Sequence, residues 1–152
     1  MNDASKYEFF GGLDGQGIPI WTSNFGQIRP LLEWNNRVGH ATMTYDAPLK
    51  KYLMCITDGW PTISTMNTFL LESDHIAGPW KLVTFMEKFG PQAYFVNIPS
   101  KFISQDGKTA WLCYSANFTN DTSYDTTFQP DPTGSKYAMC LQEIKLDYEH
   151  NR

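Results

Sequence analysis

The sequence predicts an all-β fold built from repeated four-stranded antiparallel sheets, and three observations support this prediction. Runs of strand-forming residues at 40–45, 52–57 and 68–72 are bounded by turn residues, and Gly-Pro-Trp closes the unit. The same pattern returns later in the chain at a fixed distance. Pieces of a further unit come before it. A repeat of this kind constrains the fold more strongly than any single residue does.

The repeat is visible when the chain is aligned with itself. Residues 42–57 align without a gap with residues 100–115 at an offset of 58, and Cys55 falls on Cys113. Each copy reads as a strand, a polar turn and an apolar strand. We therefore expect a strand at the beginning of each copy and another at its end.

The second copy continues after an insertion. Residues 69–73, the third strand of the central unit, correspond to residues 138–142. The delay is due to a polar, threonine-rich segment at 117–136, which we expect to be a surface loop. Residues 92–148 are thus predicted to form a second unit with an inserted loop.

The N-terminal segment predicts the outer part of a preceding unit. Within residues 6–22, two short strands flank the turn Asp14-Gly-Gln-Gly, whose glycines permit positive φ angles. Trp21 stands where Trp80 stands in the central unit. The following stretch has no clean period, and Pro30 limits any helix there to about one turn.

The central unit, residues 39–83, predicts sheets that stack on one another. Residues 41–45 alternate between polar and apolar side chains, as in a half-buried strand, whereas residues 52–56 are nearly all apolar. An apolar strand of this kind is covered on both faces, which requires a neighbouring sheet. Stacked units of about 58 residues are the pattern of a β-propeller, so we predict about two blades in this chain.

Length and composition exclude several classes of protein. The chain has 152 residues, 41% of them hydrophobic and 15% aromatic, which suits one domain spanning residues 1–152. A net charge of −4 argues against nucleic acid as a partner. No apolar run is long enough for a membrane span, and the first residues lack the pattern of a secretion signal. We expect a cytoplasmic location for the chain as written; a longer secreted parent would change that expectation.

The three cysteines favour a structural interpretation over a redox or metal-binding one. Cys55, Cys113 and Cys140 form no CxxC or Cys-His spacing, and the first two lie in apolar strands at equivalent positions. We therefore predict no cofactor and no metal site.

The blade pattern resembles a known family. In the central unit a Gly-x-x-Thr/Ser motif precedes Tyr-Asp and Tyr-Leu, and Ser-Asp-x-x-x-Gly-Pro-Trp follows them. This order of motifs is similar to the blade signature of five-bladed propeller glycoside hydrolases of the arabinanase and β-xylosidase type and their uncharacterised relatives. The resemblance covers most of residues 7–148. Its matching residues in the central unit are Tyr45, Asp46, Leu49, Tyr52, Leu53, Ser73, Asp74, Gly78, Pro79 and Trp80.

The resemblance implies carbohydrate as the ligand. In such enzymes carboxylates converge on the propeller axis near the starts of the innermost strands. Those places carry His40, Tyr94, Asn97 and Ser100 here, and none is a carboxylate. We therefore expect a glycoside-hydrolase-like module that binds sugar without a complete catalytic set. If it is an enzyme, it acts on glycosidic bonds, and its catalytic residues are not identified.

Six residues are candidates for binding a polar small molecule or sugar. Arg37, His40, Tyr94 and Asn97 would surround one pocket if the two units pack side by side, because their side chains both donate and accept hydrogen bonds. Asp58 with Trp60 offers a stacking platform. The alternatives are a structural histidine at 40 and an ordinary turn aspartate at 58.

Two blades cannot close a propeller, because the first and last sheets would expose apolar faces. We therefore predict self-association through blade faces. The alternative function is a non-catalytic protein-interaction or assembly module.

Overall fold

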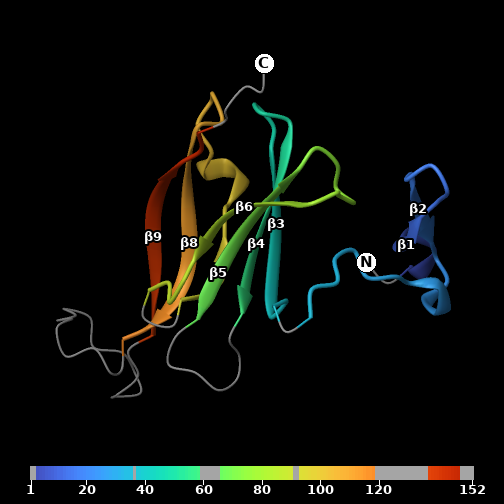
Figure 1. The fold of residues 1–152 in the computed structure, drawn as a ribbon, viewed down its shortest axis with the longest axis horizontal. Coiled ribbons are helices and arrows are strands. Elements are labelled where there is room, and N and C mark those ends of the chain that lie inside the picture. The colour runs from blue at the N-terminus through green and yellow to red at the C-terminus, as the bar shows by residue number, and fades with distance from the viewer. Residues whose placement is uncertain (1–2, 36, 59–65, 91–92, 119–136, 148–152) are drawn as a thin grey trace. The chain divides into compact units, whose positions relative to one another are not determined.

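The computed structural model describes residues 3–35, 37–58, 66–90, 93–118 and 137–147 of the chain (Figure 1). The fold is all-β with antiparallel sheets, as predicted. The helical segments of the described residues are the 3₁₀ turns η1 (Ala4–Lys6), η2 (Phe25–Gln27) and η3 (Ser100–Phe102). In this part of the chain, no helix has the length and apolarity needed to cross a bilayer. The chain divides into two compact units, Met1–Asn35 and Asn36–Arg152.

The N-terminal unit is a β-hairpin followed by a short 3₁₀ turn. Strand β1 (Phe9–Leu13) pairs antiparallel with β2 (Pro19–Thr22). The Asp14 carboxylate holds the turn between them, since its Oδ1 accepts hydrogen bonds from the backbone N–H groups of Gln16 (2.8 Å) and Ile18 (2.9 Å). Gly17 has φ +81°, which a side chain would disfavour. The predicted hairpin and its turn are therefore present.

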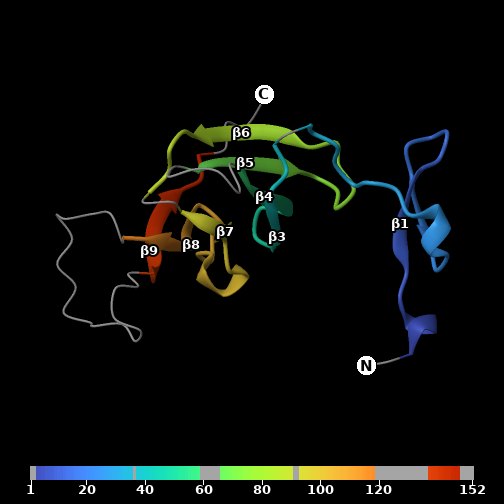
Figure 2. The same ribbon diagram turned by 90° about the horizontal axis from the view of Figure 1, so that it is seen from below.

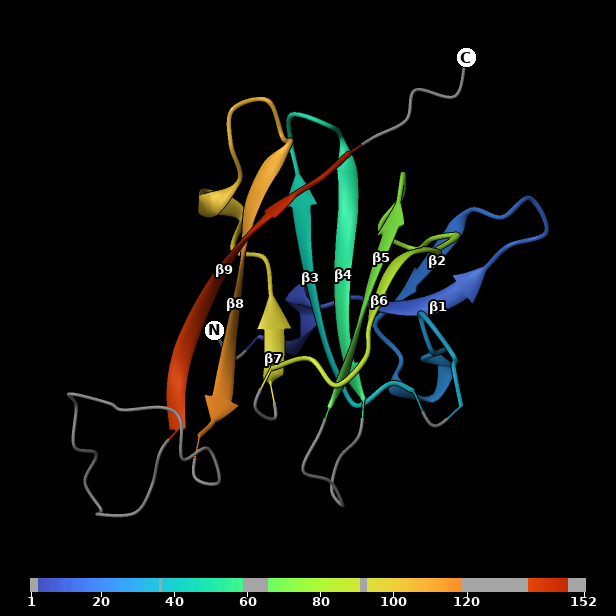
Figure 3. The ribbon, with the colours of Figure 1, turned by 60° about the vertical axis from the view of Figure 1, so that its left-hand side comes forward.

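The central unit forms one antiparallel sheet of four strands in chain order, called here the four-stranded sheet (Figure 3). Its strands are β3 (His40–Asp46), β4 (Lys51–Asp58), β5 (Asn67–Ser73) and β6 (Lys81–Met86). The first three coincide with the predicted runs to within one residue at each end. The fourth follows directly after Gly78-Pro79-Trp80, where Gly78 has φ +91° and its N–H donates to the His75 carbonyl (2.9 Å).

Burial along β4 follows the predicted pattern, whereas β3 shows the predicted alternation with its apolar residues on the exposed side. Strand β4 is covered on both faces, because its consecutive residues Leu53 and Met54 are 1% and 3% exposed. Strand β3 alternates, but its apolar Met43 and Tyr45 are the exposed members. Its threonines point toward the protein, and the Thr42 hydroxyl donates to the Val96 carbonyl of the neighbouring sheet (2.7 Å).

The second unit of the repeat forms the three-stranded sheet: β7 (Tyr94–Asn97), β8 (Thr109–Asn117) and β9 (Tyr137–Lys145), all antiparallel. Four strands were predicted for this unit, whereas its sheet has three in the part of the chain that the structure describes. The predicted loop at 117–136 lies, beyond residue 118, outside the described residues.

The prediction of a strand at the start of the second copy is wrong. Residues 100–102 form the 3₁₀ turn η3 instead of the counterpart of β3. Pro99 stands immediately before it and has no N–H to donate to a ladder, while its carbonyl accepts from the Phe102 N–H (2.9 Å). The strand that pairs with β8 is the earlier β7.

The two sheets pack face to face within the second unit. Seen from below in Figure 2, they meet at β3 and β7 and diverge toward β6 and β9. The hydrophobic core fills the space between them with side chains from both, and several are fully buried: Leu53, Cys55, Leu70, Val96, Ala110 and Leu112. This packing places the starts of β3 and β7 close together, where four of the predicted site residues lie.

Candidate functional site

Two of the predicted site residues, Arg37 and Asp58, form an ion pair. Arg37 Nη1 lies 2.9 Å from Asp58 Oδ2. The Asp58 side chain is only 5% exposed, whereas that of Arg37 is 49% exposed. Asp58 ends β4, so the pair joins that strand to the segment leading into β3. A buried carboxylate needs a partner of this kind, because desolvation of an unpaired charge is costly.

Three buried oxygen atoms surround this end of the sheet without a hydrogen-bond partner in the described structure: Asp58 Oδ1, Thr57 Oγ1 and Thr68 Oγ1. Thr57 lies opposite His40 on one side and opposite Thr68 on the other, so a polar row crosses β3, β4 and β5. Polar atoms in such positions reduce stability. This row is the polar edge of the core rather than part of its apolar centre.

A second group forms where β3 meets β7, and we call His40, Tyr94 and Phe95 the His40 site. The His40 ring centroid lies 4.3 Å from that of Phe95 and 6.5 Å from that of Tyr94. Tyr94 and Phe95 are themselves 5.2 Å apart between centroids. All three rings thus lie within contact range of one another at the edge of the core.

The backbone at Phe95 is unusual. Its φ of +54° lies in the left-handed region, which a bulky aromatic residue rarely adopts. Its side chain is 50% exposed despite being aromatic. Strain of this kind persists only where the surroundings impose it, and such positions concentrate at functional sites.

Asn97 holds the backbone at this point, where the pairing of β7 with β8 shifts register between Tyr94 and Asn97. Its Nδ2 donates to the Phe95 carbonyl (3.1 Å) and to the Cys113 carbonyl on β8 (3.0 Å). Both amide hydrogens are therefore used to hold the β7 backbone. Asn97 acts in this geometry as a positioning residue for Phe95.

The phenol of Tyr94 is neutral over the physiological pH range. Burial raises the pKa of Tyr94 above its ordinary value, the neighbouring Tyr137 raises it further, and a hydrogen bond with Ser115 opposes both effects. Together with the imidazole of His40, this group offers hydrogen-bonding capacity beside the exposed Phe95 ring.

The structure brings the predicted residues together in two groups rather than one. Thr57, the residue before Asp58, is the partner of His40 across β3 and β4, so both groups lie at the same end of the four-stranded sheet. Successive residues of a strand point to opposite faces, and His40 shares a face with Thr57. The ion pair therefore lies on the opposite face from the His40 site. Trp60, the sixth predicted residue, lies outside the described residues.

Sequence reasoning missed Phe95. The prediction placed Tyr94 and Asn97 near the start of an innermost strand, whereas Phe95, which lies between them, has the residue type of an ordinary strand aromatic. The left-handed backbone that exposes its ring leaves no signal in the residue type. The amide of Asn97 two residues later is the only local hint, because such amides often bond nearby backbone.

Asp58, the carboxylate among the predicted site residues, lies apart from the His40 site. Hydrolysis of glycosides uses two carboxyl groups facing the same bond, and Asp58 is engaged by Arg37 on the other face from the His40 site. Among the described residues, no cluster of three or more histidine, cysteine, aspartate or glutamate side chains is arranged to hold a metal ion. The cysteines are free thiols, and burial raises the pKa of Cys55 to about 12, as in a structural position.

No protein-family model, curated protein or solved structure matches this chain.

Proposed function

We propose that this chain is a non-catalytic, propeller-type module related to glycoside hydrolases, and that it binds a neutral carbohydrate at the His40 site. The observation that carries the proposal is Phe95, an aromatic side chain half exposed on a strained backbone and in contact with the His40 ring. Sugar rings stack their C–H faces on exposed aromatic rings. A fixed ring beside hydrogen-bonding groups is the usual form of such a platform.

The neighbouring groups support a neutral ligand. The protonated phenol of Tyr94 carries no charge and both donates and accepts hydrogen bonds, and the ring nitrogens of His40 add further hydrogen-bonding groups. Asn97 holds Phe95 in place before the ligand arrives, which lowers the cost of ordering the site on binding. Arg37 and Asp58, on the opposite face of the sheet, already balance each other's charge in an ion pair.

The test is a calorimetric titration with neutral arabino- and xylo-oligosaccharides and a wider glycan panel. We expect binding to the wild-type chain and a loss of about fivefold to tenfold in affinity for Phe95→Ala, since an aromatic contact contributes about 1 kcal/mol. His40→Ala should weaken binding as well. The matched control is Phe102→Ala, which removes an exposed ring outside the site (42% exposed).

Two results would contradict the proposal. One is the absence of binding across the panel by a folded wild-type chain. The other is an equal effect of the Phe95 and Phe102 substitutions, because stacking at the His40 site would then contribute nothing.

A second candidate function, a protein-interaction or assembly module, is favoured by a different observation. The outer face of the three-stranded sheet presents Trp111, Tyr137, Met139 and Leu141, which are 38%, 56%, 72% and 49% exposed. They fall on alternate positions of β8 and β9 and so share one side of the sheet. We call this set the outer β8–β9 face. Apolar surface of this kind is typical of an interface.

A further inference from the structure

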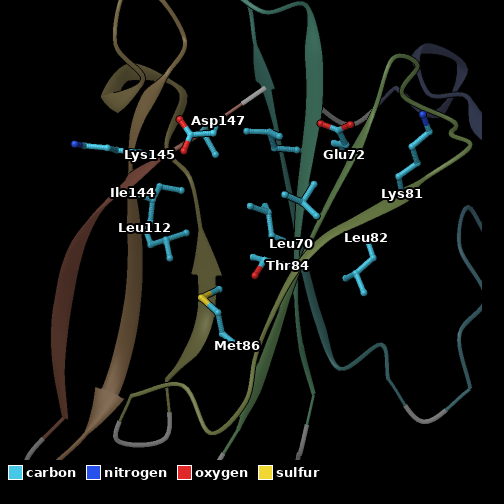
Figure 4. A pocket seen from close by; sticks show the side chains of 13 residues that line it. Leu70, Glu72, Lys81, Leu82, Thr84, Met86, Leu112, Ile144, Lys145 and Asp147 are labelled. Carbon is cyan, nitrogen blue, oxygen red and sulfur yellow. The ribbon is translucent and has the colours of Figure 1, made fainter. Parts of the chain in front are cut away.

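A cavity lies between the two sheets, away from the His40 site. It occupies about 460 Å³, within the range of small-molecule sites. It opens on the side where the outer strands β6 and β9 diverge, whereas the His40 site lies where β3 and β7 meet (Figures 2 and 4). A ligand in this cavity would therefore bind independently of the His40 site.

The body of the cavity is apolar and belongs to both sheets. Leu70 and Met86 line it from the four-stranded sheet, and Leu112 and Ile144 line it from the three-stranded sheet. The same side chains form part of the hydrophobic core or pack against it. A ligand here would bury a hydrocarbon body against the core, at roughly 25 cal/mol for each Å² removed from water.

A β-bulge in β6 adds apolar residues to the lining. The register between β5 and β6 shifts after Leu70, so that Val83 is an extra residue on β6. Successive residues of a regular strand point to opposite faces, yet Leu82, Val83 and Thr84 all line the cavity. Leu82 and Val83 are 54% and 48% exposed, so a ligand in the cavity would cover apolar surface that now faces water.

The charged residues of the lining balance one another. Glu72 on β5 is the cross-strand partner of Lys81 on β6, and Lys145 and Asp147 belong to one segment at the end of β9. Figure 4 shows these four groups in the upper part of the view, with the apolar side chains below them. Each side of the cavity thus contributes one positive and one negative group. An ionic ligand would lose hydration here without meeting a net opposite charge.

We propose that this cavity binds a neutral, largely apolar small molecule with one uncharged polar group, such as a medium-chain alcohol. The hydrocarbon body lies against Leu70 and Leu112, which belong to the core. Thr84 also lines the cavity, and its hydroxyl can donate to or accept from the polar group of the ligand. The balanced lining selects against a charge of either sign.

The test uses three probes with the same alkyl chain and different heads: 1-octanol, octanoate and octylammonium. At neutral pH their heads are uncharged, anionic and cationic, so the apolar contribution cancels in the comparison. We expect 1-octanol to bind the wild-type chain about tenfold more tightly than either ion, because an ionic head gives up hydration beside balanced charges. Octanoate and octylammonium should bind with nearly equal affinity in calorimetric titrations.

Two opposite charge variants test the balance. Glu72→Gln should make octanoate bind about threefold to fivefold more tightly than octylammonium, and Lys81→Gln should give the reverse order. Glu143→Gln is the matched control, because it changes the net charge as Glu72→Gln does. Glu143 is exposed on β9 and points to the opposite side of that sheet from Ile144, which lines the cavity. This control should leave the two ions with equal affinity.

A filling variant locates the site. Val83→Trp places a large ring at a lining position that is already half exposed, so it should occlude the cavity without disturbing the core. We expect it to weaken binding of 1-octanol by at least about tenfold. Ile76→Trp is the control, because Ile76 is 41% exposed between β5 and β6 and does not line the cavity. Thermal unfolding of both variants shows that they are folded.

Three results would overturn the proposal. They are failure of 1-octanol to bind up to the limit of its solubility, binding of either ion as tightly as 1-octanol to the wild-type chain, and full binding of 1-octanol by a folded Val83→Trp variant. The first would show a gap that takes up no ligand, the second a cavity without selection for a neutral head, and the third a binding site elsewhere.

Discussion

Asp58, the last residue of β4, is a buried charged residue whose surroundings affect the stability of the fold. Asp58 is buried and its charge is balanced by Arg37, while its second oxygen has no partner in the described structure. Such a residue stabilises the fold only as long as the guanidinium remains. The first prediction therefore concerns that pair.

Replacing Arg37 with alanine should destabilise the fold by about 1 to 3 kcal/mol, because it leaves a buried carboxylate unpaired. Urea denaturation of the variant and the wild type measures the change. Adding Asp58→Asn to Arg37→Ala should recover part of the loss, since the buried charge is then gone. Arg29→Ala is the control, because in the described part of the chain its side chain donates to the adjacent Ile28 carbonyl and to no carboxylate. A loss as large in Arg29→Ala would exclude the ion pair as the cause.

The second residue-scale prediction concerns pH. Asp46 is completely buried; burial raises its pKa above the ordinary value of 3.8, the Leu49 N–H opposes the shift, and nearby Asp106 adds to it. The stability that protonated Asp46 contributes is therefore fully present below pH 3.8 and is lost as pH rises through the folded-state pKa. Asp46→Asn should gain stability relative to the wild type over that rise.

Asp74 gives the opposite sign and serves as the comparison. The hydrogen bond from Lys51 lowers the pKa of the Asp74 carboxyl, so its contribution is present above 3.8 and is lost as pH falls through the folded-state pKa. Thermal unfolding from acidic to neutral pH should show the Asp46→Asn and Asp74→Asn curves departing from the wild type in opposite directions. Parallel curves would refute the assignment of either shift.

At the scale of elements, the turn between η3 and β8 packs on the hairpin between β3 and β4. Gly107 has φ +74°, and a Cβ there would lie 2.5 Å from Leu49 Cγ and 2.7 Å from Asp46 Oδ1. The absence of a side chain at this position therefore permits two turns, one from each sheet, to touch. The carboxylate of Asp46 is buried by this contact.

Gly107→Ala should accordingly destabilise the protein by about 2 to 5 kcal/mol, the sum of the backbone strain and the clash. Gly17→Ala is a matched control, because Gly17 has φ +81° with nothing within 4 Å of its added Cβ, so only about 1 to 2 kcal/mol of strain is expected. The free energies of unfolding in urea measure both. Equal losses would mean that the contact between the turns has no energetic weight.

The elements show how far the sequence alone predicts this protein. Alternation and turn residues placed β3, β4 and β5 correctly, because those signals are local. The self-alignment wrongly predicted a strand at Ser100–Phe102. The structure has a 3₁₀ turn there, because Pro99 just before it has no N–H to donate to a strand partner. The hairpin β1–β2 was also predicted, because Asp14 and its glycines specify the turn directly.

The site was predicted less completely, for a physical reason. His40 and Tyr94 were expected to share a pocket, and the packing of β3 on β7 brings their rings within 6.5 Å of each other. The separation of Arg37 and Asp58 onto the other face depends on strand register, and the exposure of Phe95 depends on a left-handed backbone angle. Neither property follows from residue type.

At the scale of the whole molecule, the outer β8–β9 face determines the expected state in solution. We predict that copies associate through it, because its side chains are apolar and exposed on one side of a sheet. Light scattering on a sizing column should give a multiple of 17.4 kDa. The double variant Met139→Glu with Leu141→Glu should shift the mass toward the monomer, whereas Phe102→Glu should not. A wild-type chain that stays monomeric at every concentration would contradict this prediction.

The central claim, that a neutral sugar binds at the His40 site, is tested most directly by an NMR titration of the wild-type chain with the oligosaccharide that binds best in calorimetry. The account predicts shifts of the imidazole signals of His40 and the ring signals of Phe95 and Tyr94. The methyl groups of Leu82 and Leu146, which line a cavity between the two sheets, should be unchanged. Shifts confined to that cavity, or a titration that leaves the three rings unchanged, would contradict it.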